Sequence, residues 1–309
     1  NDVIIGAPFA RPNNKVNAGS SYVVFGSNSG FNASFELSTL DGDNGLLLSG
    51  ESVNDEAGAA VNSTGDFNGD GIDDVIVGAT GADEGGNQTG NSYVVFGGGG
   101  IFPALLALSN INSNTGMVIS GENASDRSGE SVSFAGDVNG DGIDDLIIGA
   151  KSASKSYVVF GSGTGLPGTL SLDSLNGQNG FAIHGGFSDH FGVSVSGAGD
   201  VNGDGYDDVI IGAERDDPNK IYNVGSSYVV FGSNTMPNPL VVSNLNGNNG
   251  FVIIGESAQD GAGNAVSSAG DVNGDGLDDL LIGASAAGDA GISYVVFGRE
   301  KPIFENGFE

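Results

Sequence analysis

DFNGDGIDD, at residues 66–74, is the stretch that decides the fold, because its pattern occurs four times along the chain. The pattern D-x-N-G-D-G-x-D-D recurs at residues 137–145, 200–208 and 271–279, and successive copies start 71, 63 and 71 residues apart. Short Asp and Asn side chains between glycines favour a tight turn and concentrate oxygen atoms around it. Each copy therefore predicts a cation-binding loop, and the spacing divides the chain into repeating units.

The oxygen atoms of each loop are expected to surround one divalent cation. Side chains at positions 1, 3, 5 and 9 and the backbone carbonyl at position 7 can converge on one point, and glycine at position 6 allows the sharp bend. We therefore expect Ca2+ at about four sites, one in each copy. The predicted ligands are Asp66, Asn68, Asp70, Ile72 and Asp74; Asp137, Asn139, Asp141, Ile143 and Asp145; Asp200, Asn202, Asp204, Tyr206 and Asp208; and Asp271, Asn273, Asp275, Leu277 and Asp279.

The loop differs from an EF-hand, which closes its site with a bidentate Glu at position 12. Here position 12 holds Val77, Ile148, Ile211 or Ile282, already within an apolar run. The missing acid also argues against a dockerin-like pair of helices, and the long spacing excludes the tandem nonapeptides of β-helical toxins. Loop tips that merely increase solubility are the remaining alternative, and four copies in register disfavour it.

The composition allows a folded core and disfavours anionic partners. The formal net charge is −30, from 39 acidic and 9 basic residues, while 38% of the residues are hydrophobic and gather in β-branched runs. Such a chain can fold, but it has no general affinity for nucleic acid or for an anionic membrane. No apolar stretch of about 18 residues is present, so we expect no membrane insertion. The absence of cysteine excludes thiol catalysis and disulfides, and calcium sites of this kind favour an extracellular location.

Four segments recur in each unit and predict four β-strands. Each loop runs into an apolar strand that ends in Gly-Ala, followed by a Tyr-Val-Val-Phe-Gly segment, a third apolar run, and a strand of small residues that leads into the next loop. The Gly-Ala strands lie at residues 2–7, 74–79, 145–150, 208–213 and 279–284, the Tyr-Val-Val-Phe-Gly segments at 22–26, 93–97, 157–161, 228–232 and 294–298, and the third runs at 46–50, 117–121, 181–185 and 251–255.

The predicted strands are apolar at successive positions, so both faces of each sheet are expected to be buried. No segment has the helical periodicity that a parallel α/β fold needs, and a two-layer sandwich would usually leave one polar face. Blades packed radially around an axis bury both faces. We therefore predict an all-β fold, a β-propeller of four-stranded antiparallel blades with the calcium loops between the first and second strands.

One propeller domain is expected at residues 1–298, with about 4.5–5 blades and with the first and last blades incomplete. Asn1 and Asp2 align with the last two positions of a loop, which predicts that the N-terminus is truncated. Blade units are predicted near residues 1–56, 57–127, 128–190, 191–260 and 261–298, followed by a C-terminal tail at 299–309. Residues 302–309 resemble the ends of exported bacterial proteins; alternatively, Ile303, Phe304 and Phe308 pack against the last blade.

The units resemble FG-GAP repeats, the blades of the integrin α-subunit propeller and its bacterial relatives. The resemblance rests on the four loops, the D-[VL]-[IL]-[IV]-G-A strands, Gly6-Ala7-Pro8 and Phe191-Gly192, and it extends to about Gly298. It implies a secreted or cell-surface propeller that serves adhesion or ligand binding. The other units lack the proline and most lack the Phe-Gly pair. Propellers of this family usually have seven blades, which implies that this chain is a fragment or forms a smaller ring.

The face opposite the calcium loops is predicted to contact a ligand, because loops on a rigid scaffold commonly carry function. An extracellular protein or glycan is the expected partner, and lysines could also collect on this face only because they avoid crowded loops and strands. The connections between second and third strands hold Arg11, Lys15, Lys151, Lys155, Arg215 and Lys220, and Arg127 lies between blades.

No catalytic constellation or cofactor motif is evident, so we expect no enzymatic activity in this chain. His184 and His190 are the only histidines, and neither has a recognisable reactive partner in the sequence. Two alternatives stay open: the propeller of a secreted polysaccharide lyase or phospholipase, and a purely structural module of a large surface protein. A cluster of His, Tyr, Arg and acidic residues at the mouth of the propeller axis would support an enzyme, and the sequence shows few such residues.

Overall fold

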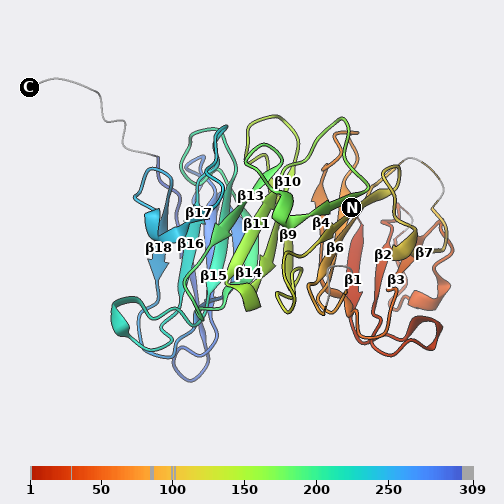
Figure 1. The fold of residues 1–309 in the computed structure, drawn as a ribbon, viewed down its shortest axis with the longest axis horizontal. Helices are drawn as coiled ribbons and strands as arrows, with labels where there is room; N and C mark the ends of the chain where they lie inside the picture. The colour runs from red at the N-terminus through yellow and green to blue at the C-terminus, as the bar shows by residue number, and fades with distance from the viewer. Residues whose placement is uncertain (1, 29, 84–86, 99, 101, 301–309) are drawn as a thin grey trace, which may run out of the picture.

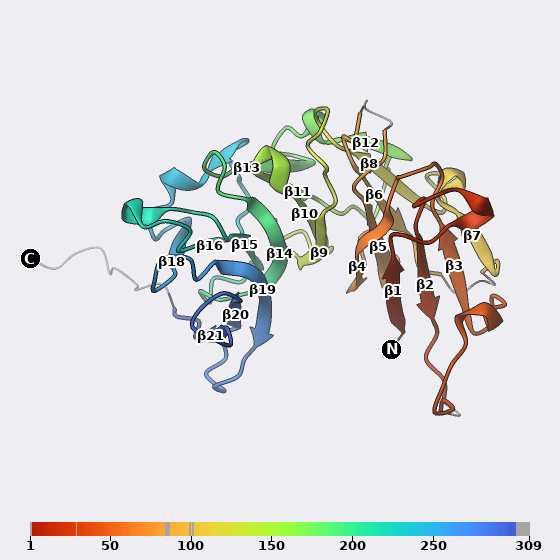
Figure 2. The ribbon, with the colours of Figure 1, turned by 90° about the horizontal axis from the view of Figure 1, so that it is seen from below.

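The protein is built from β-sheets. The computed structural model describes residues 2–28, 30–83, 87–98, 100 and 102–300, and in these ranges it contains 21 strands in five sheets, with seven short 3-10 helices. We number the sheets blade 1 to blade 5 along the chain. The blades follow one another around an arc, with their innermost strands on the concave side (Figure 1, Figure 2). The predicted all-β fold of propeller-type blades is confirmed.

The strands of each blade pair in a constant order from the concave side outward. In that order, the blades contain β1 (Val3–Ala7), β2 (Ser20–Val24), β3 (Gly45–Ser49) and β7 (Leu105–Ala107); β4 (Ala57–Gly65), β5 (Asp74–Ala79), β6 (Asn91–Val95), β8 (Gly116–Ser120) and β12 (Thr169–Ser171); β9 (Ser131–Gly136), β10 (Asp145–Ala150), β11 (Lys155–Val159), β13 (Gly180–His184) and β17 (Leu240–Val241); β14 (Phe191–Gly199), β15 (Asp208–Ala213), β16 (Ser226–Val230) and β18 (Gly250–Ile254); and β19 (Ala262–Gly270), β20 (Asp279–Ala284) and β21 (Ile292–Val296). The 3-10 helices are η1 (Pro12–Asn14), η2 (Leu37–Thr39), η3 (Leu108–Asn110), η4 (Lys151–Ala153), η5 (Leu172–Ser174), η6 (Pro218–Lys220) and η7 (Val242–Asn244).

Each of the first three blades has an outermost strand that the sequence does not predict. β7, β12 and β17 pair in parallel with β3, β8 and β13, and each comes from the unit that forms the next blade. The antiparallel pairing of the predicted strands is observed, and the structure adds to it a short parallel strand at this edge that the prediction lacks. These strands are only two or three residues long and run directly into a 3-10 helix, so they are too short to show a strand periodicity.

The added strand covers the outer edge of its blade. Val118 on β8, which pairs with β12, is only 7% exposed. β18 has no such partner within the described part of the chain, and Val252 at the equivalent position is 42% exposed.

The hydrophobic core consists of layers between neighbouring blades. Ile76 on β5 packs in the layer with Phe134 and Leu146 of blade 3. The next residue, Val77, points the other way and packs in the layer with Leu48 of blade 1. Successive residues of one strand thus belong to different layers, which explains why the strands are apolar at consecutive positions.

Glycines allow the inner strand of one blade to approach the second strand of the blade before it. A Cβ on Gly149 of β10 would clash with the backbone carbonyl of Gly192 at the start of β14, and Gly192 has a positive φ of 86°. The same pair of glycines recurs at the other three junctions, as Gly6 and Gly58, Gly78 and Gly129, and Gly212 and Gly263. The backbone contact between blades therefore requires both glycines, whereas the residue before the second glycine varies (Ala57, Ser128, Phe191 and Ala262).

We expect Gly149→Ala to lower the free energy of unfolding by about 1–3 kcal/mol, because the added methyl group has no room at the blade junction. Chemical denaturation followed by circular dichroism measures this change. Gly98→Ala is the matched control, since nothing lies within 4 Å of a Cβ at that position. Equal stability of the two variants would contradict the proposed role of the glycine pair.

Candidate metal-binding loops

The four Asp-rich loops join the innermost strand to the second strand in blades 2 to 5. Their position 9 is the first residue of β5, β10, β15 or β20, and the loop begins directly after β4, β9, β14 or β19. This is the position that the sequence predicts. All four loops consequently lie at the same end of the inner strands.

Backbone hydrogen bonds to the first aspartate shape each loop. In the second loop, Oδ1 of Asp137 accepts hydrogen bonds from the backbone N–H groups of Gly140 at 2.7 Å and Asp141 at 2.9 Å. Its Oδ2 accepts one from Gly142 at 2.7 Å, and Gly142 has a φ of 87°. Asp141 in turn accepts a hydrogen bond from Ile143 N–H at 3.0 Å. The loop thus folds around the carboxylate at position 1, as glycine at position 6 allows.

The aspartate at position 9 is buried and connects the loop to the third strand of its blade. Asp145 is 0% exposed, and its carboxylate accepts hydrogen bonds from the N–H groups of Val138 at 3.0 Å and Gly161 at 2.9 Å. Gly161 is the glycine of a Tyr-Val-Val-Phe-Gly segment. The other three position-9 aspartates accept the same two hydrogen bonds: Asp74 from Phe67 and Gly97, Asp208 from Val201 and Gly232, and Asp279 from Val272 and Gly298.

Burial makes the charged form unfavourable for Asp74, Asp145 and Asp208. Burial is the main cause that raises the pKa of Asp145 to about 8, and the charges of Asp141 and Asp137 add to it, while the two N–H donors lower it. Burial likewise raises the pKa of Asp208 to about 8 and that of Asp74 to about 7. A cation in the loop would favour the charged carboxylates and oppose this effect.

The donor atoms in the loops fit a hard cation such as calcium. Asn202, at position 3 of the third loop, is 3% exposed, and its Oδ1 atom is buried with no hydrogen-bond partner among the described residues. An unpaired buried oxygen is costly unless it finds a donor or a cation. In the part of the chain that the structure describes, however, no three His, Cys, Asp or Glu side chains are already grouped as a cation-binding cluster. The convergence of the predicted ligands on one ion therefore stays a prediction.

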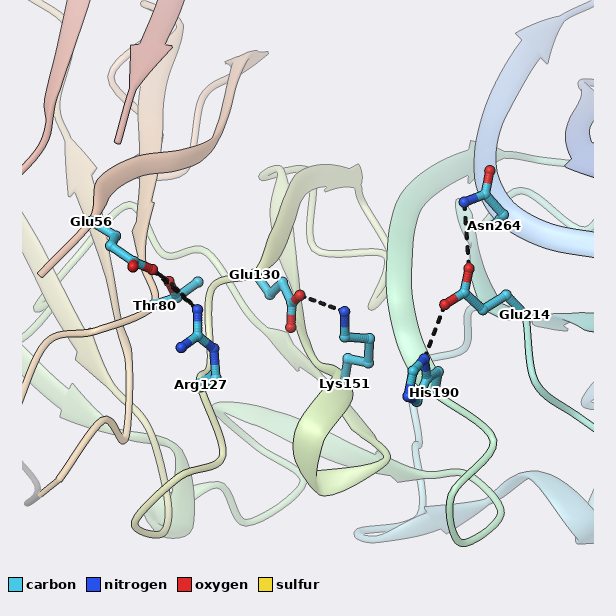
Figure 3. A network of polar contacts seen from close by, with 8 residues as sticks. All are labelled: Glu56, Thr80, Arg127, Glu130, Lys151, His190, Glu214 and Asn264. Carbon is cyan, nitrogen blue, oxygen red and sulfur yellow. Dashed lines mark hydrogen bonds and ion pairs between the residues drawn. The ribbon is translucent and has the colours of Figure 1, made fainter. Parts of the chain in front are cut away.

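A second set of polar residues lies at the other end of the inner strands, where the chain enters them (Figure 3). Glu56 bonds with Arg127 at 3.1 Å and with Thr80 at 2.7 Å, which joins blades 2 and 3. His190 Nδ1 lies 2.9 Å from Glu214 Oε1, and Asn264 donates to the other Glu214 oxygen at 3.4 Å, which joins blades 4 and 5. Lys151 pairs with Glu130 at 2.6 Å within blade 3.

The sequence interpretation missed this set, although a signal for it exists. Glu56, Arg127 and His190 each stand directly before the residue that precedes the junction glycine, and each has a positive φ between 52° and 58°. Thr80, Lys151 and Glu214 each follow a Gly-Ala strand end. Alignment of the units therefore places these six residues at two equivalent positions of the repeat. Only the folded chain shows that these two positions lie close together in space.

Three of the basic residues on the predicted ligand face are held in ion pairs, and Arg127, paired with Glu56, is one of them. Lys151 pairs with Glu130, and Lys155 pairs with Glu122 at 2.6 Å. Although burial opposes the charge of Glu122, hydrogen bonds from Lys155 and from Tyr157 Oη, at 2.8 Å, hold its pKa below the usual value. Arg215 is exposed and lies in the connection between β15 and β16.

Repeated blades with an Asp-rich loop between the first and second strands define a β-propeller type of repeat protein. The FG-GAP repeat model matches this chain at residues 57–95, 128–165, 191–230 and 262–296. The chain therefore carries four FG-GAP repeats, which confirms the resemblance that the sequence motifs indicate. The matched segments run from the inner strand through the loop to the third strand of blades 2 to 5.

The chain is also similar to integrin α chains. It is 29% identical over 245 residues to integrin alpha pat-2 of Caenorhabditis elegans, an alignment that covers 74% of this chain and 18% of that protein. Identity to integrin alpha-5 of Xenopus laevis is 29% over 184 residues, or 57% of this chain and 16% of the relative. For integrin alpha-PS2 of Drosophila melanogaster it is 30% over 198 residues, or 59% and 12%. The chain thus spans less than a fifth of the length of these relatives.

Among the described residues, no helix is long and apolar enough to cross a membrane.

We expect Asp145→Ala to lower the free energy of unfolding by about 2 kcal/mol in EDTA, because two buried N–H groups lose their acceptor, and by more in calcium, because a predicted ligand is lost as well. Asp141→Ala is the control in the same loop, because Asp141 is exposed. This change should alter stability in EDTA by less than about 0.5 kcal/mol and should remove stabilisation only in calcium. Denaturant titrations of both variants in both buffers make the comparison. A normal stability of Asp145→Ala in EDTA would be inconsistent with a structural role for this carboxylate.

Proposed function

We propose that this chain is a calcium-stabilised, non-enzymatic β-propeller module that serves adhesion or ligand binding outside the cell or at its surface. The main support is the loop that occurs four times, and in three of its copies a buried carboxylate at position 9 lies within range of the charges of two further aspartates. The similarity to integrin α chains supports the adhesion part of the proposal. The ion would be held by the side chains at positions 1, 3, 5 and 9 and the carbonyl at position 7, and it would offset part of the negative charge of the loop.

We further propose that residues 1–298 form one propeller domain, with units near residues 1–56, 57–127, 128–190, 191–260 and 261–298. The predicted tail at 299–309 lies mostly outside the described residues, which end at residue 300. The packing of Ile303, Phe304 and Phe308 is therefore a prediction that this structure does not address.

The secreted-enzyme alternative gains one observation from the structure. His190 and Glu214 lie together at the entry to the inner strand of blade 4, and Arg127 lies at the equivalent position before the inner strand of blade 3. Their polar atoms, however, are used in contacts within and between blades: Arg127 pairs with Glu56, and both Glu214 oxygens accept hydrogen bonds. A role in joining the blades accounts for these contacts, so we favour the binding module.

The ligand, an extracellular protein or glycan, is proposed to bind the face opposite the calcium loops. Arg215 and Lys220 are exposed there, in the connection between β15 and β16. Because Lys151 and Lys155 are already paired with acids, the exposed pair is the better candidate for contact.

Chelation should destabilise the protein. We expect EDTA to lower the melting temperature by roughly 5–10 °C or more, because four acidic loops lose their counter-ion. Calcium should restore the original value, and magnesium should do so poorly, since it requires stricter octahedral geometry. Differential scanning calorimetry measures the three states. A melting curve that does not change with EDTA would rule out structural calcium.

Binding should depend on the exposed basic residues. We expect the double variant Arg215→Ser, Lys220→Ser to lose at least about tenfold in affinity for whichever probe the native chain binds on arrays of glycans and extracellular-matrix proteins. Arg299→Ser is the control, because Arg299 is also an exposed base but lies near the calcium-loop end. An equal loss in the control, or none in the double variant, would move the ligand site elsewhere.

A further inference from the structure

Each of the first three calcium loops is held by the loop of the next blade. The backbone N–H of Asp66, at position 1, donates to the carboxylate of Asp144, at position 8 of the following loop, over 2.8 Å. The same bond runs from Asp137 to Asp207 at 2.8 Å and from Asp200 to Asp278 at 3.1 Å. Position 8 is not among the predicted cation ligands, so this contact gives the first aspartate of the D-D pair a role of its own.

Backbone contacts reinforce the bond between loops. The N–H of Asp207 donates to the carbonyl of Asp137 at 3.1 Å, so that these two residues exchange two hydrogen bonds. The carbonyl at position 2 of each held loop also accepts a hydrogen bond from the next blade. The donor is the backbone N–H of the residue that follows the Tyr-Val-Val-Phe-Gly segment there. These bonds run from Ser162 to Phe67 at 3.0 Å, from Ser233 to Val138 at 2.9 Å and from Arg299 to Val201 at 2.9 Å.

Side chains also pack at this contact between neighbouring loops. The residue at position 7 of the next loop covers the glycine at position 4. A Cβ on Gly69 would lie 3.2 Å from Ile143, one on Gly203 would lie 3.1 Å from Leu277, and one on Gly140 would clash with the ring of Tyr206. The hydrophobic residue at position 2 is buried in the junction, with exposures of 0% for Phe67, 0% for Val138 and 3% for Val201.

The fourth loop, at residues 271–279, is folded like the others but is not held. Asp271 accepts hydrogen bonds from Asp275 at 3.1 Å and Gly276 at 2.9 Å, as in the other loops. No blade follows it within the described residues, however. Val272 at position 2 is consequently 60% exposed, and nothing lies within 4 Å of a Cβ on Gly274. In the part of the chain that the structure describes, three loops are thus held and the fourth, which has the same sequence pattern, is free.

We propose that the position-8 aspartates Asp144, Asp207 and Asp278 are positioning residues for the cation site of the preceding loop, so that the three held loops bind calcium more tightly than the fourth. Each fixes the backbone of the residue that supplies the first ligand, and a site that is ordered in advance loses less entropy when the ion binds. Its negative charge close to the loop also favours a cation. This inference rests on the proposed calcium sites.

Asp207→Ala and Asp73→Ala form a matched pair that tests the inference. Both remove the carboxylate at position 8, but no loop precedes Asp73 within the described residues, so only Asp207→Ala breaks a contact between loops. In calcium titrations by isothermal calorimetry, the native chain should show three tighter sites and one weaker site. Asp207→Ala should weaken one of the tighter sites by roughly tenfold, as expected for one charge-assisted hydrogen bond. Asp73→Ala should keep all three.

Hydrogen exchange in EDTA provides a readout that does not need calcium. The amides of residues 137–142 should exchange faster in Asp207→Ala than in Asp73→Ala, because the Asp137 N–H has lost its acceptor. Asp207→Asn keeps an acceptor oxygen and nearly the same volume, and it should show a smaller effect in case the alanine variant does not fold.

The outcomes separate the two proposals. If no calcium binds to the native chain, the calcium-stabilised function is wrong, and hydrogen exchange still decides whether Asp207 holds the loop. If calcium binds to four equal sites and Asp207→Ala changes neither affinity nor exchange, the positioning role is overturned and the calcium function stands.

Discussion

The blades depend on the hydrogen bonds that a buried carboxylate accepts at the end of each Asp-rich loop. Asp145 accepts one hydrogen bond from the start of its own loop and one from the end of the third strand, so it fixes two segments that are more than 20 residues apart. Asp2 makes the corresponding contact to Gly26 in blade 1, at 2.8 Å. The position costs free energy, because a charged group is taken out of water beside other acids. A divalent cation is the natural compensation, and this requirement connects the architecture to the proposed function.

Much of the fold could be predicted from local sequence. Apolar runs such as residues 145–150 mark strands, and their consecutive hydrophobic residues indicate sheets buried on both sides, as the opposite directions of Ile76 and Val77 confirm. The loops could be located because their turn residues are local. The parallel pairing of β12 with β8 could not be predicted, since a three-residue strand carries no period and its partner lies some 50 residues away.

The candidate site, like the fold, could be predicted only in part from the sequence. The residues around the loop follow from the motif, but the roles of Asp144, Asp207 and Asp278 depend on a loop from another blade. Similarly, the Phe-Gly pair is incomplete in most units, which the sequence interpretation treated as a departure. The contacts between blades show that only the glycine is needed, because its backbone touches Gly149 or its equivalents. The phenylalanine is one of several residues that can precede it.

Blades 1 to 3 each take their outermost strand from the unit that forms the next blade. One repeat of the sequence is therefore not the same segment as one blade of the structure. Blade 2, for example, takes β12 from the unit that follows, while β7 of its own unit completes blade 1, so neighbouring repeats overlap at their edges. Deleting or exchanging a single repeat at its sequence boundary would therefore damage two blades: its own and the one before. Among the described residues no outer strand covers Val252 on β18, and this edge shows the kind of surface that such a cut would expose. We therefore expect repeats of this kind to be gained and lost in evolution together with the short outermost strand. The boundaries of such an evolutionary unit in the sequence would then differ from the boundaries of the blade in space.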